Sequence, residues 1–268
     1  MINIDTFLKI GDSHKVCEDY VIQGSTPFPY IILSDGCSSS DNTEMGARIL
    51  CHLAKQYLTY RGDNLYGLDY HKLGQWVIHN AELTARQLGL KVSSLDATLI
   101  VSYEIDSVVY VHMYGDGVVV AKDRDGGIGV DFIEFTNNAP YYLTYLLDDF
   151  RDHIYHTNKN SKSLNAINPN GRTSNIELAY DHKVILKYET MSCPTIFICS
   201  DGIQSFIKKD PSQRDIFPVE AIVPDMMAFK NTKGEFLKRR LKRALKTLNN
   251  DGIVHYDDLS IGAYTRIE

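Results

Sequence analysis

Short apolar runs followed by Asp-Gly recur at three places along the chain. Residues 30–33 lead into Ser-Asp-Gly with Asp35, and residues 195–199 lead into a second Ser-Asp-Gly with Asp201. Short, β-branched runs bounded by small polar residues predict buried strands that stop abruptly. A third apolar run ends in Gly-Asp-Gly with Asp116. Each predicted strand therefore ends in a carboxylate, and strands lying side by side would bring the three carboxylates together.

Helical spacing of apolar residues predicts three helices. The first runs from Asp41 or Thr43 to Arg61-Gly62, the second covers residues 70–88 and the third covers residues 234–249. The apolar residues expected to face the core are Met45, Ile49, Leu50, Leu53 and Tyr57 in the first helix, Leu73, Trp76, Val77 and Leu83 in the second, and Leu237, Leu241, Ala244, Leu245 and Leu248 in the third. The opposite face of the third helix is basic. Such a face is most often simply solvated, but it can also dock an acidic or phosphorylated partner.

Outside these helices the apolar period changes to that of strands. Four runs separated by short turns predict an antiparallel meander, at residues 98–103, 108–113, 118–122 and 128–135. Turns this short exclude helical crossovers, so this sheet is not a doubly wound parallel one. Further strands are predicted at residues 2–10, at an edge, and at residues 182–188, 195–200 and 259–264.

The segment from Thr136 to Asn175 shows the least regular pattern. It begins with an aromatic, partly helical stretch and continues into Asn, Ser and Lys residues, with a strong turn signal at residues 168–171. Long irregular segments in compact domains are usually functional or mobile. We therefore expect a flap beside the site that influences the choice of substrate.

The composition is that of a soluble globular protein. Of 268 residues, 23% are charged and 44% are hydrophobic, which suits one large domain or two small ones. A single domain over residues 1–268 is the simpler expectation. The formal net charge of −6 argues against broad binding to nucleic acid.

The cysteines and the apolar runs predict the compartment. Five cysteines, without a Cys-x-x-Cys pair, indicate neither a disulfide framework nor a cysteine zinc site. The first residues lack the basic leader and apolar core of a signal peptide, and no run approaches the ~20 apolar residues of a membrane span. The expectation is a cytoplasmic protein with no membrane partner.

The recurring aspartates have an ordinary explanation and a functional one. Asp-Gly is among the commonest turn pairs, and Asp125-Gly126 and Asp251-Gly252 are interpreted as turns. Glu18 and Asp19 are by the same argument solvated surface residues, unless Asp35 is a metal ligand that requires further carboxylates nearby. Two buried strands ending in the same Ser-Asp-Gly favour a site, and carboxylates that crowd together usually hold a cation.

Five motifs in order add up to a family resemblance. They are Glu18-Asp19, Ser34-Asp35-Gly36, Gly115-Asp116-Gly117, Ser200-Asp201-Gly202 and Asp257-Asp258-Leu259-Ser260. In this order and spacing the chain resembles the metal-dependent protein phosphatases of the protein phosphatase 2C type. Gly11-x-Ser-His14 resembles the opening of a bacterial branch, and Met45-Gly46-Ala47, at the start of the helix after Asp35, supports the resemblance further. The resemblance extends over nearly the whole chain.

The resemblance implies both a fold and a binuclear metal centre. The fold is α+β, a four-layer α/β/β/α sandwich in which two antiparallel sheets pack face to face between helices. The metals are two Mn²⁺ or Mg²⁺ ions, with a weaker third, and oxygen donors suit such hard cations. The implied roles are Asp35 bridging both ions, the Gly36 carbonyl on the second, Asp201 and Asp257 on the first, Asp116 with Asp201 at the third, and Glu18 and Asp19 acting through coordinated water.

Two positions depart from the family pattern. Where many members have an arginine that grips the substrate phosphate, this chain has His14, with Lys15 beside it. Neither side chain reproduces the arginine fork, so phosphate is held differently or more weakly. Several members have a histidine after the first Asp-Gly as a general acid, and here that residue is Cys37.

The leading hypothesis is a protein serine/threonine phosphatase that opposes a kinase in cytoplasmic signalling. Asp35, Asp201 and Asp257 carry catalysis by holding the metals that activate water and neutralise phosphoryl charge, and phosphoserine or phosphothreonine on a protein is the substrate. One alternative is a weak or silent member of the fold that binds a phosphoprotein as a regulatory module. Another is a metal phosphoesterase for small phosphates.

Overall fold

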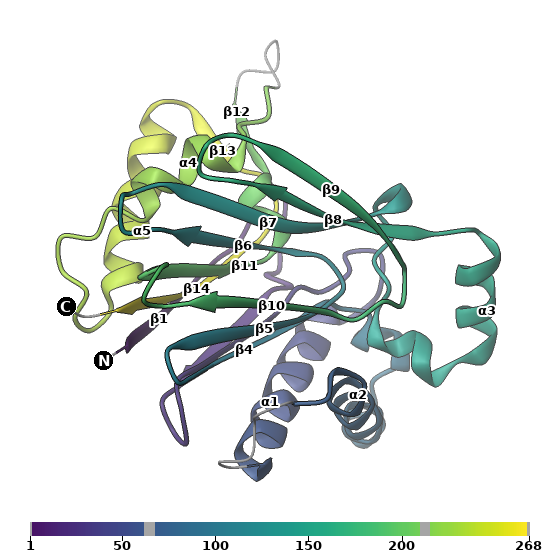
Figure 1. Ribbon diagram of the computed structural model, residues 1–268. Coiled ribbons are helices and arrows are strands. Elements are labelled where there is room, and N and C mark those ends of the chain that lie inside the picture. Colours follow the sequence, from purple (N-terminus) through teal and green to yellow (C-terminus); the bar gives the residue numbers. More distant parts are fainter. Residues whose placement is uncertain (1, 62–67, 210–214, 267–268) are drawn as a thin grey trace.

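Two antiparallel sheets lie face to face between two layers of helices (Figure 1). The computed structural model describes residues 2–61, 68–209 and 215–266. In the seven-stranded sheet the strands follow the order β1 (Ile2–Lys9), β14 (Leu259–Arg266), β11 (Thr195–Cys199), β6 (Gly117–Lys122), β7 (Ile128–Phe135), β8 (Ser161–Ile167) and β9 (Thr173–Ala179). In the five-stranded sheet the order is β10 (Val184–Glu189), β5 (Val108–Tyr114), β4 (Leu99–Ile105), β3 (Tyr30–Ser34) and β2 (Tyr20–Gly24).

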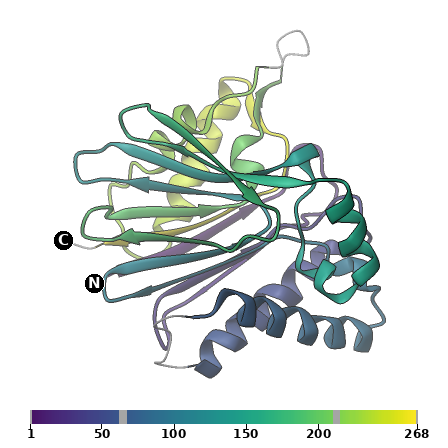
Figure 2. The same ribbon diagram turned by 45° about the vertical axis from the view of Figure 1, so that its right-hand side comes forward.

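Helices cover both outer faces of this pair of sheets. The five-stranded sheet is covered by α1 (Thr43–Arg61) and α2 (Tyr70–Gln87), and the seven-stranded sheet by α4 (Val219–Met226) and α5 (Phe236–Asn250) (Figure 2). A further helix, α3 (Asp149–Thr157), lies at one end of the sheets, and β12 (Phe206–Lys208) pairs with β13 (Ile253–His255). The predicted four-layer α+β sandwich is confirmed. No helix of the described residues is long and apolar enough to cross a membrane.

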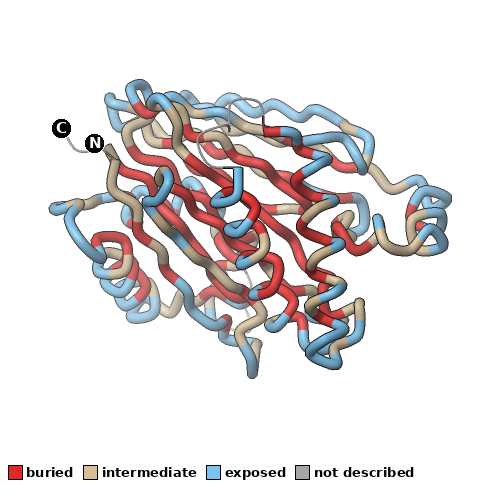
Figure 3. Tube along the Cα trace, turned by 90° about the horizontal axis from the view of Figure 1, so that it is seen from below, coloured by how far each residue is buried: buried red, intermediate tan, exposed pale blue. Residues whose placement is uncertain are grey.

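The uninterrupted apolar sequence of β3 is explained by its place in the fold. Tyr30 and Ile32 pack against α1 and α2, whereas Ile31 and Leu33 point into the space between the sheets. Both faces of the strand are therefore buried, and no position is left for a polar alternation. Figure 3 shows the same arrangement for the whole molecule, with buried residues along the central strands and exposed ones at the periphery.

The predicted meander is wrong as a single sheet. Its first two strands, β4 and β5, pair in the five-stranded sheet, whereas β6 and β7 belong to the seven-stranded one. The chain changes sheets at Gly115 and Gly117, whose φ angles of 93° and 145° lie where side chains are strongly disfavoured. This crossing places Asp116 at the end of both sheets, a position that strand periodicity could not reveal.

Residues 161–179 are also more regular than expected. Instead of an irregular flap they form the β8–β9 hairpin, which extends the seven-stranded sheet through the predicted turn at residues 168–171. Within residues 136–179, the longest stretch without a long helix or strand is residues 136–148. Two positions expected to face the core are exposed, Met45 by 37% and Leu83 by 60%. The predicted helix end at Gly62 lies outside the described residues.

Candidate metal and active site

The strand ends converge on one hollow of about 220 Å³. Asp35 follows β3, Asp116 lies where the chain changes sheets, Asp201 follows β11, and Asp257 precedes β14. The lining residues are Asp35, Gly36, Cys37, Ser38, Ser39, Thr98, Asp116, Asn138, Pro140, Tyr142, Asp201 and Asp257. The structure therefore brings together four predicted aspartates and Gly36, which come from four separate stretches of the chain.

Asp35 is positioned by the residues that precede β4. The Asp35 backbone N–H donates to Thr98 Oγ1 at 3.1 Å, and the Thr98 N–H donates to the Asp35 carbonyl at 2.8 Å. At Gly36 a Cβ atom would lie 2.8 Å from the Thr43 side chain, so only glycine fits between β3 and α1. The turn after β3 is thus fixed by tight packing and by paired hydrogen bonds.

A close approach of two backbones places Asp201 beside Asp257. A Cβ atom on Gly202 would lie 1.8 Å from the Asp258 carbonyl oxygen, which forbids any side chain there. The Asp257 N–H donates to Ser205 Oγ at 3.1 Å. Glycine in the second Ser-Asp-Gly therefore serves the site through packing, in addition to any role in the turn.

Asp258 is a structural residue that the sequence interpretation passed over in favour of its neighbour. Its side chain is 1% exposed, and it accepts hydrogen bonds from the N–H groups of Gly11 at 2.7 Å and Glu18 at 2.6 Å. It thereby fixes both ends of the loop that leads into β2. The sequence signal for this role was the adjacent pair Asp257-Asp258. Asp257 lines the hollow, whereas Asp258 holds the backbone of the loop.

Glu18 and Asp19 lie next to the hollow without lining it. Asp19 is buried, and its Oδ2 accepts a hydrogen bond from Ser200 Oγ at 2.8 Å, whereas its Oδ1 has no partner among the described residues. Glu18 Oε1 accepts from Thr43 Oγ1 at 3.1 Å. Both carboxylates are thus held beside the predicted ligands, with Asp19 the deeper of the two.

His14 and Lys15 do not line the hollow. His14 Nε2 lies 3.3 Å from Asp257 Oδ1, and its Nδ1 lies 3.1 Å from Asp258 Oδ2. Burial alone would lower the pKa of His14, but hydrogen bonding to Asp258 and the nearby carboxylate charges raise it above its ordinary value. The Lys15 side chain is exposed. His14 therefore pairs with two carboxylates beside the hollow.

The aspartates of the hollow repel one another. Removal from water, followed by the charges of Asp19, Asp201 and Asp116, raises the pKa of Asp35 well above its usual range. Removal from water and the charge of Asp201 also raise the pKa of Asp116 and of Asp257. Asp201 Oδ1 is buried without a hydrogen-bond partner in the described part of the chain. A divalent cation would relieve this repulsion and give the orphaned oxygen a partner.

The donors fit a hard cation that keeps part of its water. Among residues 2–61, 68–209 and 215–266, no three or more His, Cys, Asp or Glu side chains lie close enough together to hold a metal ion as they stand. The aspartates instead surround an open hollow. Mg²⁺ prefers oxygen donors, retains several waters and binds through one or two carboxylates at a time, whereas zinc sites are usually built with His or Cys ligands. An open ring of aspartates therefore suits such ions better than a closed cage would.

An ion-paired cluster ties the segment after β7 to the hollow, and sequence reasoning missed it. Asp96 is 4% exposed, and both of its oxygens lie 3.1 Å from Arg151 Nη2. Thr144 Oγ1 and Ser40 Oγ donate to the same carboxylate at 2.6 and 3.0 Å. Arg151 also lies over the Tyr145 ring, 4.7 Å from its centre. Single charged residues far apart in sequence gave no signal for this contact.

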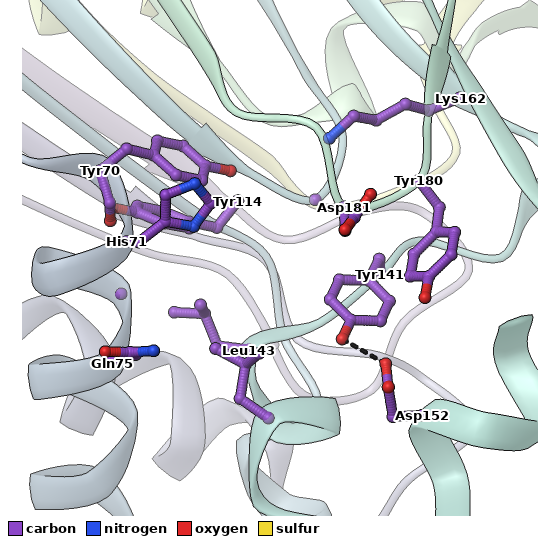
Figure 4. Close-up of a pocket in the computed structure, with 13 residues that line it drawn as sticks. Tyr70, His71, Gln75, Tyr114, Tyr141, Leu143, Asp152, Lys162, Tyr180 and Asp181 are labelled. Carbon is purple, nitrogen blue, oxygen red and sulfur yellow. Dashed lines mark hydrogen bonds between the residues drawn. The ribbon is translucent and has the colours of Figure 1, made fainter. Parts of the chain in front are cut away.

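A second cavity of about 260 Å³ lies next to the hollow (Figure 4). Tyr141 and Leu143 line this cavity, whereas Tyr142 between them lines the aspartate hollow. Tyr141 donates to Asp152 Oδ1 at 2.5 Å, and Lys162 points into the cavity near Asp181. The segment 140–143 therefore separates two cavities, and the second carries charges of both signs.

The fold and the hollow together define the class: an α+β sandwich of phosphatase type with an acidic site where its two sheets end. The family model of protein phosphatase 2C matches residues 10–246, and the chain belongs to this family. No curated protein matches the sequence. Similarity to solved structures is instead found at the level of the fold.

Three of these structures are the following. The catalytic domain of serine threonine protein phosphatase PstP, in complex with two manganese ions, superposes with a TM-score of 0.53 at 16% identity over 100% of this chain and 99% of that one. The serine/threonine phosphatase Stp1 from Staphylococcus aureus superposes with a TM-score of 0.57 at 13% identity, over 100% of this chain and 96% of that one. PppA, described as a key regulatory component of the T6SS in Pseudomonas aeruginosa, superposes with a TM-score of 0.57 at 12% identity, over 99% of this chain and 98% of that one. At such identities the likeness establishes the fold.

Proposed function

We propose that this chain is a metal-dependent protein serine/threonine phosphatase built as one catalytic domain over residues 1–268. The observation that carries the proposal is the convergence of Asp35, Asp116, Asp201 and Asp257 on one hollow. Family membership and the manganese-bound structure of PstP support it. A phosphorylated protein is the substrate, and the enzyme opposes a serine/threonine kinase.

Two Mn²⁺ or Mg²⁺ ions are the proposed cofactors. Asp35, the Gly36 carbonyl, Asp201 and Asp257 would hold them, with Asp116 at a weaker third position. When bound, such ions activate water for in-line attack and neutralise charge on the phosphoryl group. Glu18 and Asp19, beside these ligands, would hold water at the edge of the hollow.

The chain's own contribution is rigid positioning of negative charge. Thr98 fixes the backbone at Asp35, and Ser205 fixes the backbone at Asp257. Ser200 orients Asp19. Because these partners are already in place, little reorganisation is needed when the cations and the substrate bind, and preorganised groups are the main source of electrostatic catalysis.

Asn138 and Tyr142 replace the missing arginine as polar groups at the rim of the hollow. Both line it, and Tyr142 comes from the segment that the Asp96–Arg151 ion pair anchors. Removal from water raises the pKa of Tyr142, so its hydroxyl stays protonated and can donate a hydrogen bond to a phosphoryl oxygen. His14 remains with Asp257 and Asp258, and their carboxylates favour its protonated form.

The cysteines support a reducing compartment. All five are free thiols, and Cys51 and Cys199 are buried. Disulfides are rare in the cytosol, and free buried cysteines are ordinary there. We therefore place the protein in the cytoplasm, where a kinase and its phosphorylated substrates are accessible to it.

The test is hydrolysis of a phosphothreonine peptide and of p-nitrophenyl phosphate by protein stripped of metal. Activity should appear only when Mn²⁺ or Mg²⁺ is added back, and Asp201→Asn should reduce it by at least about 100-fold because a direct ligand is lost. Asp125→Asn changes an exposed turn carboxylate and is the matched control. Metal-independent turnover, or full activity of the Asp201 variant, would contradict the proposal.

One observation favours a second candidate, a silent member of the fold that binds a phosphoprotein. Neither an arginine nor a lysine is among the described residues that line the hollow. Phosphate would then be bound mainly through cations, and turnover could be lost while binding remains. Calorimetry that shows Mn²⁺ binding without any hydrolysis of the two substrates above would support this candidate.

A further inference from the structure

Outside the aspartate hollow, positive charge gathers on one part of the molecule. Residues 228–250 contain eight lysines and arginines and a single acidic residue, Glu235, in a chain whose net charge is −6. Helix α5 has no acidic residue in its first turn, where the helix dipole favours one. Like charges four residues apart, such as Arg239 and Arg243, also weaken a helix. Folding alone gives no reason for this arrangement.

The charges line a cavity of about 310 Å³. We call it the basic cavity, and its lining residues are Ala228, Phe229, Lys230, Asn231, Lys233, Phe236, Arg239, Arg240 and Arg243. Five cations and no carboxylate are among them. Within the described part of the chain, Arg240 pairs with Asp225 at 3.4 Å, whereas Lys230, Lys233 and Arg243 make no ion pair. Most of the positive charge is therefore left uncompensated.

The walls of the basic cavity are rigid. Phe236 is 1% exposed, and its ring meets that of Phe229 edge-on at 4.9 Å. The loop before α5 is held by Asn3 Nδ2, which donates to the Thr232 carbonyl at 2.7 Å, and by Arg239 Nη2, which donates to the Lys233 carbonyl at 2.7 Å. A preformed site loses little entropy on binding.

We infer that the basic cavity docks an acidic segment of the phosphoprotein substrate, an inference that rests on the proposed function for the identity of the partner. Charge complementarity requires an anionic occupant. The cavity is concave and includes two phenylalanines in its lining, which suits a peptide better than a membrane surface or a nucleic-acid duplex. Insertion into a membrane is disfavoured because the apolar side of α5, including Leu237, Leu241 and Leu245, is already buried against the sheet.

Strand β1 sets the distance between the docking site and the hollow. Asn3 at its start contacts the loop that borders the basic cavity, and Gly11 just beyond its end is bonded to Asp258 beside the hollow. Eight residues of strand span about 26 Å. An extended peptide needs at least about eight residues to cover that length. The acidic segment should therefore lie eight or more residues from the phosphorylated residue.

Binding can be measured without catalysis, by fluorescence anisotropy with metal-free protein. The probe is a fluorescein-labelled twelve-residue peptide rich in Glu and Asp, compared with its Gln and Asn counterpart. We expect binding of the acidic peptide alone, weakened at least about tenfold by the pair Arg239→Gln and Arg243→Gln, because charge-assisted contacts are lost. The pair Lys242→Gln and Lys246→Gln removes the same charge from the same helix outside the cavity and should change affinity less than about twofold.

If both pairs of variants lost the same affinity for the acidic peptide, the binding would depend on general surface charge and the inference would be wrong. Absence of binding, or tighter binding to single-stranded RNA or anionic vesicles than to the peptide, would overturn it as well. Circular dichroism confirms that the variants are folded. Because the assay needs no turnover, binding without phosphatase activity would refute the proposed function alone, and activity without binding would refute the docking site alone.

Discussion

Removing one negative charge from the hollow should stabilise the metal-free protein. The raised pKa of Asp35 means that the folded state holds the proton of this carboxyl more tightly than the unfolded chain does. Stability is therefore lost as the pH rises above 3.8, the unfolded value, toward the folded pKa. Each pKa unit corresponds to about 1.4 kcal/mol. Asp35→Asn keeps the shape and removes the charge, so unfolding at pH 7.5 in a chelator should need more urea.

The same substitution should abolish the response to metal. At an ion concentration 100 times its dissociation constant, one site stabilises the folded wild-type protein by about 2.7 kcal/mol. For a domain of this size that corresponds to a rise in Tm of roughly 5–10 °C. Without Asp35, the proposed bridging ligand, the rise should largely disappear. The expected result is thus a crossover: the variant is more stable without Mn²⁺ and less stable with it.

Differential scanning calorimetry with EDTA and with Mn²⁺ measures both effects. Asp125→Asn is the matched control, because Asp125 is exposed in a turn and does not line the hollow. The control should follow the wild type under both conditions. If Asp35→Asn were less stable in EDTA and still gained the full increase in Tm from Mn²⁺, the electrostatic account of the hollow would be wrong.

Three further predictions concern residues away from the hollow. Burial lowers the pKa of His112 to about 4. Its folded state therefore resists protonation, so stability is lost as the pH falls from 6.5 to 4, by up to about 3 kcal/mol, and His112→Gln should flatten this slope in urea titrations relative to the wild type. A Cβ atom at Gly46 would lie 1.7 Å from the Ser94 carbonyl oxygen. Gly46→Ala should therefore lower the unfolding free energy by about 2–4 kcal/mol, and an unchanged Tm would contradict the packing. Arg151→Gln leaves the buried Asp96 without its ion pair and should cost about 3 kcal/mol, with faster proteolysis within residues 136–157 than in the wild type as the readout.

The periodicity of the sequence predicted the elements better than their assembly. Helices α1, α2 and α5 and most strands lie where apolar spacing placed them, because each buries a face that leaves a local pattern. The change of sheet at Gly115 left no such pattern, since both flanking strands are equally apolar. Helix α4 was missed for a related reason: it is short, with eight residues, and contains Pro224. The face-to-face arrangement of the sheets came from the family resemblance.

For the candidate site, sequence motifs predicted which residues take part, but not how their side chains are arranged. Motifs identified the aspartates that line the hollow: Asp35, Asp116 and Asp201 lie beside glycines at strand ends, and Asp257 begins the Asp-Asp-Leu-Ser run that leads into β14. They could not show that Asp258 would hold the backbone while its neighbour Asp257 faced the hollow, since both are aspartates in one run. They also could not join Asp96 to Arg151, which lie 55 positions apart. Contacts of this kind depend on the tertiary fold alone.

The tight backbone packing around the hollow also brings its carboxylates close enough to repel one another. Glycine at positions 36 and 202 lets the chain segments approach so closely that carboxylates from separate strands share one hollow. Removal from water, followed by the charges of the neighbouring aspartates, raises the pKa of Asp35 and Asp116, which makes the ion-free site electrostatically unfavourable. These close contacts leave the segments little room to move apart, so the repulsion would persist unless cations offset it. The stability that the fold loses here is therefore the source of the affinity that we propose for metal.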